Sequence, residues 1–179
     1  MYNPLNVELP AGYTASVTDG QRTPEICVRI SYQGQLLRED TLSPQDWLDE
    51  AEGDLVLATD MVSGIAAHFA YNCAVAHHRV RQVLGDDGLR DETTGITLRY
   101  RHDLHANRLE IHYSRHDKPL FSDNYSMPDL YMPNAFREAP DLQWLLADIR
   151  EDFYELVAWD VTDEKTAAQV LDALEEGRW

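Results

Sequence analysis

The chain has 179 residues, of which 44% are hydrophobic and 26% are charged, a composition typical of globular proteins rather than disordered ones. Its 15 Lys and Arg stand against 32 Asp and Glu, which gives a formal net charge of −17. This charge argues against direct binding to nucleic acid or to an anionic membrane, since both require a basic surface. Two cysteines without a metal or redox spacing, and no signal-peptide pattern, predict a cytoplasmic protein.

The N-terminal part, residues 1–58, shows the alternation of apolar and polar residues that predicts β-strands, with a hairpin turn at Gln33-Gly34. Ser43-Pro44 followed by Asp46 has the pattern of a helix start and predicts a short helix. The apolar run Leu55–Ala58 fits either a short strand or the lead-in to the next helix.

A long central helix is predicted over residues 60–84, with Asp60 as its N-cap and Gly85 as its end. Its apolar stripe at helical spacing includes Ile65, Phe69, Ala76, Val80 and Val83. Such a stripe predicts that one face of this helix lies in the core.

Residues 95–122 are predicted to form a β-hairpin that continues as a meander, with strands at 95–103 and 108–115 and a third near 119–121. The apolar residues of the first two strands share one face only in certain registers, because a slip of one residue turns every side chain over. A four-residue loop, Leu104–Asn107, satisfies this condition. It pairs Leu98 with Tyr113, Tyr100 with Ile111 and Arg101 with Glu110.

Residues 122–140 contain three prolines and are predicted to be irregular, whereas residues 141–176 are predicted to be helical, with a last helix that begins near Thr162. No segment of the sequence repeats another. The chain is therefore predicted to be a single α+β domain over residues 1–179. In that fold, an antiparallel β-sheet built from hairpins carries one long central helix and two C-terminal helices.

An acidic segment covers residues 39–60, which hold eight acids and no base. Such a run is either solvated surface or a patch that steers a basic partner into contact. The residues assigned to partner binding are Asp46, Asp49, Glu50, Glu52 and Asp54.

The loop at 122–140 is rich in aromatic residues and methionine, which are frequent anchors in protein interfaces. Its candidate anchors are Tyr125, Met127, Tyr131, Met132 and Phe136. The alternative is that these side chains pack beneath the loop as a satellite cluster.

The outward face of the 95–118 hairpin is basic, in contrast to the rest of the chain. Its predicted members are Arg99, Arg101, Arg108, His112 and His116. Cross-strand ion pairs such as Arg101 with Glu110 are one interpretation. The alternatives are an anion site, or self-association with the acidic segment of a second copy as a homodimer.

No pattern predicts a catalytic residue, a cofactor or a metal site. The seven histidines lack a metal-ligand spacing, and Cys73 with His77 on the same helix is more typical of core packing than of a nucleophile and its base. The sequence therefore favours a binding protein over an enzyme.

The first functional hypothesis is a small acidic protein that inhibits a basic, nucleic-acid-acting protein by covering its surface. It would act either as an immunity protein or antitoxin, or as an inhibitor whose carboxylates imitate the phosphates of nucleic acid. The alternatives are an acidic secretion chaperone or adaptor, and a small enzyme that uses the Arg/His face of the 95–118 hairpin.

Overall fold

The structure is a computed structural model that describes residues 8–19, 25–127, 142–160, 169 and 172. The chain forms two compact units. Among the described residues, unit 1 holds those up to His78, and unit 2 holds 79–127 and 142 onward. The fold is α+β with antiparallel sheets, as predicted, although the strands form two sheets instead of one.

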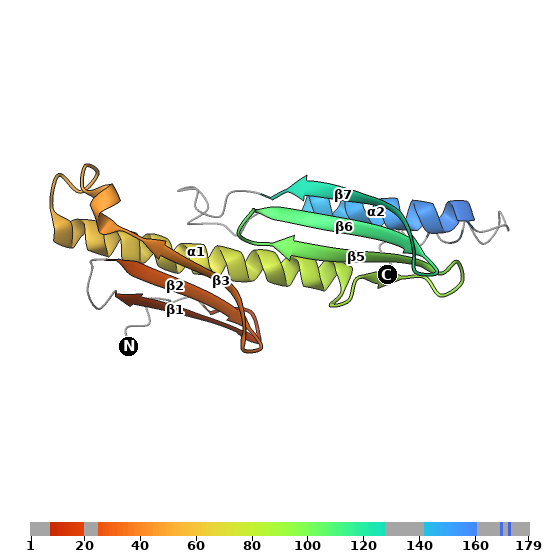
Figure 1. The fold of residues 1–179 in the computed structure, drawn as a ribbon, viewed down its shortest axis with the longest axis horizontal. Coiled ribbons are helices and arrows are strands. Elements are labelled where there is room, and N and C mark those ends of the chain that lie inside the picture. Colours follow the sequence, from red (N-terminus) through yellow and green to blue (C-terminus); the bar gives the residue numbers. More distant parts are fainter. Residues whose placement is uncertain (1–7, 20–24, 128–141, 161–168, 170–171, 173–179) are drawn as a thin grey trace. The chain divides into compact units, whose positions relative to one another are not determined.

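Unit 1 contains a three-stranded antiparallel sheet in the order β1-β2-β3 (Figure 1). Its strands are β1 (Tyr13–Asp19), β2 (Ile26–Tyr32) and β3 (Gln35–Leu42). The 3-10 helix η1 (Pro44–Trp47) follows, with Ser43 as its N-cap, and then comes α1 (Leu55–Leu84), whose residues up to His78 belong to this unit. The hairpin at Gln33-Gly34 is confirmed.

The core of unit 1 lies between the sheet and α1. Val28 and Ile30 of β2 and Phe69 of α1 are fully buried. The Arg38 guanidinium lies 4.6 Å from the centre of the Phe69 ring, and its Nε binds the Asp40 carboxylate. A charged residue thus occupies the core face of β3, where Phe69 and Asp40 compensate its loss of hydration.

The predicted start of the long helix was wrong, because α1 begins at Leu55 rather than near Asp60. Asp54 is the residue that caps it: one of its carboxylate oxygens accepts hydrogen bonds from the backbone N–H groups of Val56 (2.8 Å) and Leu57 (3.2 Å). The apolar run at Leu55 is therefore the first turn of the helix. The predicted end at Gly85 is confirmed, and this glycine has a φ of 77°.

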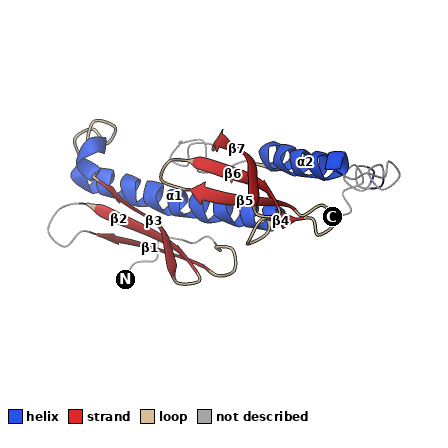
Figure 2. Ribbon diagram, turned by 45° about the vertical axis from the view of Figure 1, so that its right-hand side comes forward, coloured by secondary structure: helices blue, strands red, loops and turns tan. Residues whose placement is uncertain are grey.

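Unit 2 contains a four-stranded antiparallel sheet in the order β4-β5-β6-β7 (Figures 1 and 2). Its strands are β4 (Leu89–Arg90), β5 (Ile96–Asp103), β6 (Arg108–Arg115) and β7 (Lys118–Ser126), and its helix is α2 (Gln143–Asp160). The predicted register is confirmed: Leu98 pairs with Tyr113, Tyr100 with Ile111, and Arg101 with Glu110.

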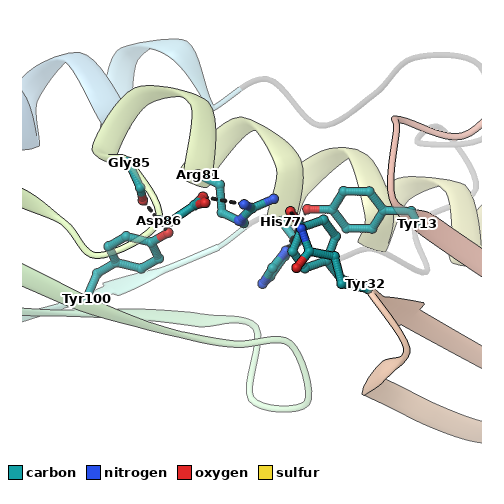
Figure 3. Close-up of polar contacts among 8 residues, drawn as sticks. Tyr13, Tyr32, His77, Arg81, Gly85, Asp86 and Tyr100 are labelled. Carbon is teal, nitrogen blue, oxygen red and sulfur yellow. Dashed lines mark hydrogen bonds and ion pairs between the residues drawn. The ribbon is translucent and has the colours of Figure 1, made fainter.

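The core of unit 2 lies on one face of this sheet. Leu98, Ile111 and Tyr113 of the sheet and Ile149 and Phe153 of α2 are at most 1% exposed. Two polar contacts close the end of the unit near Gly85 (Figure 3). The Tyr100 hydroxyl donates to the Gly85 carbonyl at 2.8 Å, and Arg81 pairs with Asp86.

The C-terminal third differs from the prediction at one point and lies partly outside the described residues. Strand β7 continues to Ser126, so the predicted irregular loop does not begin at residue 122. The ladder to β6 extends the strand, since Ser122, Asn124 and Ser126 all have partners in it. The predicted second C-terminal helix, from Thr162 to about residue 176, lies outside the described residues apart from positions 169 and 172. Among the described helices, none combines the length and hydropathy that a membrane crossing requires.

The two units share the same order of strands and helix along the chain and the same turn geometry. In each, three antiparallel strands are followed by a helix: β1-β2-β3 and α1 in unit 1, β5-β6-β7 and α2 in unit 2. The corresponding strands begin 83 positions apart at Tyr13 and Ile96, and again at Gln35 and Lys118. The second hairpin in each unit has a two-residue turn with positive φ, Gln33-Gly34 or His116-Asp117.

Three further details occur at the same spacing. A β-bulge follows Ile30 in unit 1 and Tyr113 in unit 2. A glycine with positive φ precedes β1 and another precedes β5, Gly12 with φ 86° and Gly95 with φ 71°. In both units the carbonyl of this glycine accepts a 2.9 Å hydrogen bond from the first turn residue, Gln33 or His116.

The structure therefore contains a repeat, so the prediction that no segment repeats another was wrong. Few paired positions carry the same residue, Gly12 with Gly95 and Ser31 with Ser114 among them. The repeat lies in the backbone geometry, which many sequences satisfy, so side-chain identity does not reveal it.

Candidate functional site

The acidic segment of unit 1 forms the connection from β3 to α1. Asp46 lies in the single turn of η1, Glu52 precedes Gly53 in the turn before α1, and Asp54 caps that helix. We define the acidic patch as Asp46, Asp49, Glu50, Glu52, Asp54 and Asp60, all of which are exposed.

The carboxylates of the acidic patch differ from the two acids that precede them. Glu39 and Asp40 pair with Arg29 and Arg38 within the sheet. Within the described part of the chain, no member of the acidic patch forms a salt bridge. The patch therefore keeps its negative charge available to a partner, with only Asp54 also engaged, at the helix N-terminus.

Three exposed aliphatic residues lie inside the acidic patch in sequence. Leu55, Val56 and Leu57 form the first turn of α1 and are 40%, 74% and 48% exposed. The sequence pattern did not predict that these three side chains are exposed. The available signal was the apolar run directly after Asp54, a residue type that can cap a helix. Aliphatic residues surrounded by charge are typical of interface centres with polar rims.

Of the five anchor residues expected between positions 122 and 140, the structure describes Tyr125 and Met127. Tyr125 is half-buried within β7, and Met127 is 8% exposed and so offers almost no surface. The burial of these two side chains fits the alternative interpretation, in which they pack in a satellite cluster. Tyr131, Met132 and Phe136 lie outside the described residues.

The basic face of the unit 2 sheet forms largely as predicted. Arg99, Arg101, Arg108 and His112 are exposed on the face opposite the core. Glu110 lies 3.9 Å from both Arg101 and Arg108, and Asp103 lies 3.9 Å from Arg101. These arginines are thus neutralised in part by loose, exposed pairs, each worth a few tenths of a kcal/mol.

Arg99 and His112 differ from the other members of this face. They lie directly opposite each other, and Ser122 of β7 is the next residue in the same row. A surface hollow of about 380 Å³ covers the row, and its wall also includes Ser114, Asp117 and Phe121. Arg99 forms no ion pair with any residue of the described ranges.

His116 does not continue the strand face, because it lies in the turn between β6 and β7 with a φ of 46°. Its ring lies over Gly95, where a side chain would collide with it. His116 lines a second, larger hollow of about 820 Å³ together with Arg90, Arg99, Asp86 and Asp87. The mixture of charges in this hollow indicates no single ligand class.

Cys73 and His77 do not form a nucleophile and its base. Cys73 is fully buried, and burial raises the pKa of its thiol to about 12, so it stays protonated at neutral pH. Nδ1 of His77 instead shares a 2.7 Å hydrogen bond with the Tyr13 hydroxyl (Figure 3). In the described part of the chain, no three His, Cys, Asp or Glu side chains are grouped to hold a metal ion.

Comparison with known proteins identifies no relative. No protein family, no characterised protein and no solved structure matches this chain.

Proposed function

We propose that this chain is a small acidic cytoplasmic protein that inhibits a basic, nucleic-acid-acting protein by covering its surface. One observation supports this above the others: six exposed carboxylates without salt bridges among the described residues flank three exposed aliphatic side chains at the start of α1. The partner has a basic surface with an apolar depression. Its phosphate-binding cations meet the carboxylates, as in an immunity protein or antitoxin, or in an inhibitor that imitates nucleic acid.

The two kinds of side chain have separate roles in this proposal. The acidic patch and the net charge of −17 accelerate association with a cationic protein through long-range attraction. Leu55, Val56 and Leu57 bury apolar area once contact is made, which slows dissociation. Salt should therefore slow association more than it speeds dissociation.

The experiment compares three forms of the full chain as affinity baits at low salt. One is the wild type and one carries Asp49→Lys, Glu50→Lys and Glu52→Lys. The matched control carries the same charge change on the exposed side of α2, with Asp148→Lys, Glu151→Lys and Glu155→Lys. We expect wild type and control to retain a basic nuclease or nucleic-acid-binding protein that the patch variant loses and that high salt releases.

The captured protein is then assayed for its own activity with and without the chain. Inhibition by wild type that the patch variant lacks supports the proposal. Equal capture by all three baits, or an association rate that does not change between low and high salt, contradicts it.

The second candidate function is that of a secretion chaperone or adaptor, and a different observation supports it. Trp144 and Trp159 on α2 are 62% and 82% exposed, which is unusual for such large apolar side chains. A chaperone would hold a partly unfolded client through apolar contact. Its complex would resist high salt and would depend on these tryptophans instead of the acidic patch.

A further inference from the structure

The strongest additional feature is a third hollow, of about 260 Å³, which lies between the last turns of α1 and the first turns of α2. The residues of α1 that line it occupy positions i, i+3 and i+4, and those of α2 include positions i, i+3 and i+7, so each set lies on one face of its helix. All of them belong to unit 2. The wall includes Arg79, Gln82 and Val83 of α1, and Gln143, Leu146 and Arg150 of α2.

The charge of this wall is the reverse of the charge of the whole chain. Two arginines line the hollow, and no acid lies among its described wall residues, although the net charge of the chain is −17. The hollows of about 380 and 820 Å³ each have at least one aspartate in their walls. Arg79 and Arg150 are both only partly exposed. Two guanidinium groups that share a partly buried space favour an anion between them, because water screens their repulsion incompletely there.

Arg150 indicates most directly which kind of group the hollow can take. Its Nε is buried and has no hydrogen-bond partner among the described residues, and its side chain forms no salt bridge with any of them. Its guanidinium does hydrogen-bond Tyr154, one turn further along α2, but this neutral hydroxyl does not balance its charge. A carboxylate accepts two parallel N–H bonds from one guanidinium, so it would supply both an acceptor and a countercharge.

The other wall residues define the rest of the ligand. The carboxamides of Gln82 and Gln143 can each donate and accept, so they complement the N–H and C=O of a peptide-type amide. Val83 and Leu146 supply apolar surface that an aliphatic side chain can cover. The volume of about 260 Å³ lies just below the roughly 300–1,000 Å³ of sites for drug-sized ligands, which suits a ligand of the size of one acylated amino acid.

We propose that this hollow binds the carboxylate of an N-acylated amino acid with an aliphatic side chain, a group found at the C-terminus of a peptide and in small acylated amino acids. Arg79 and Arg150 hold the carboxylate, Gln82 and Gln143 bind the amide, and Leu146 contacts the aliphatic side chain. The site lies in unit 2 and is independent of the acidic patch of unit 1 that carries the proposed function.

The test titrates the full chain at low salt with N-acetyl-leucine, with N-acetyl-leucinamide, in which a neutral amide replaces the carboxylate, and with inorganic phosphate. Calorimetry measures the affinities, and NMR follows the Nε–H signal of Arg150. We expect N-acetyl-leucine to bind at least about tenfold more tightly than either other probe and to shift the Arg150 signal. A peptide that ends in leucine then distinguishes the two sources, since it binds at least as tightly as N-acetyl-leucine only if the site accepts a peptide C-terminus.

Three variants assign the binding to this hollow. Arg150→Met removes the charge at similar side-chain length and should weaken N-acetyl-leucine binding at least about tenfold. Arg99→Met, an exposed arginine of the same unit outside this hollow, is the matched control and should leave binding unchanged. Ala147 also lines the hollow and is exposed, so Ala147→Phe should fill the space and block the ligand without unfolding the chain.

Four results would overturn the proposal, provided that circular dichroism shows the variants folded. They are no binding of N-acetyl-leucine to wild type, equal binding of the acid and its amide, equal binding of phosphate and the acid, and equal binding by wild type and Arg150→Met. None of these results bears on the acidic patch, whose test uses a different partner and different residues.

Discussion

Unit 1 and unit 2 share one backbone plan but use it differently. Both place a glycine with positive φ before a strand, β1 in unit 1 and β5 in unit 2. In both, the carbonyl of this glycine accepts a hydrogen bond from the turn two strands on, and a β-bulge follows at the same spacing. In unit 1 the charged residues of the sheet are paired, Arg29 with Glu39 and Arg38 with Asp40. In unit 2 the corresponding positions are His112 with Ser122 and Phe121 with Asp123, and these pairs are absent.

This difference separates the backbone features that determine the fold from the side chains that can differ between the two units. The turns and the register depend on backbone dihedrals and hydrogen bonds, which different side chains satisfy equally well. The outer face and the edge strand tolerate exchange because they contact solvent. The two units can therefore keep one architecture although their sheets carry different charged residues.

The largest expected effect tests whether the two units have equivalent cores. Phe69 of α1 and Phe153 of α2 are at most 1% exposed, so Phe69→Ala and Phe153→Ala should each lower the free energy of unfolding by about 3–5 kcal/mol. Urea denaturation measures this loss. Trp159→Ala is the control, since an 82% exposed side chain should change stability by no more than about 0.5 kcal/mol. A loss near that control value at Phe69 would mean that its place in the core is misassigned.

A smaller loss of stability is expected when the Arg38–Asp40 ion pair of unit 1 is broken. Arg38→Met removes a cation that is 6% exposed and leaves Asp40 without it, which should cost about 2–3 kcal/mol. This loss of stability is smaller than the loss expected for a fully buried ion pair, because the Asp40 side chain is 26% exposed. Adding Asp40→Leu should recover most of the loss, as unfolding in urea would show. Failure of the double variant to recover would mean that Arg38 stabilises unit 1 mainly through Phe69.

The smallest effect concerns acids of unit 2 that form no salt bridge with any residue the structure describes. Burial, then Asp123 and Asp148, raise the pKa of Asp152 on α2. The folded state therefore holds this proton more tightly than the unfolded chain, whose pKa is about 3.9. The stability from this group is greatest below that value and falls as pH rises through the folded pKa.

Asp152→Asn should remove that fall, so the variant should gain stability relative to wild type between acidic and neutral pH. Thermal melts from about pH 4 to pH 7 measure the difference. Glu155→Gln, an exposed neighbour on the same helix, is the control. A variant that follows the wild-type pH dependence would contradict the assignment.

Several features of the fold could be predicted from the sequence because local residue patterns determine them. The β5–β6 register followed from the need to place Leu98 and Tyr113 on one face, and the end of α1 followed from Gly85. The start of α1 was misjudged because Asp54 and Asp60 are both acceptable N-caps, and the choice between them depends on how the chain leaves η1. The length of β7 was underestimated because prolines beyond it obscured a strand that its ladder partners extend.

The sequence by itself determined the α+β class, the hairpins, the long helix and the acidic segment, since each depends on neighbours close along the chain. Only the tertiary structure decided which charges remain without salt-bridge partners, that Leu55, Val56 and Leu57 are exposed, and that Met127 is buried. It also placed Arg99, His112 and Ser122 in one row and matched that row to Ser16, Arg29 and Glu39. These facts depend on pairing between residues distant in sequence, where the environment of a side chain is set by the strands and helices folded against it.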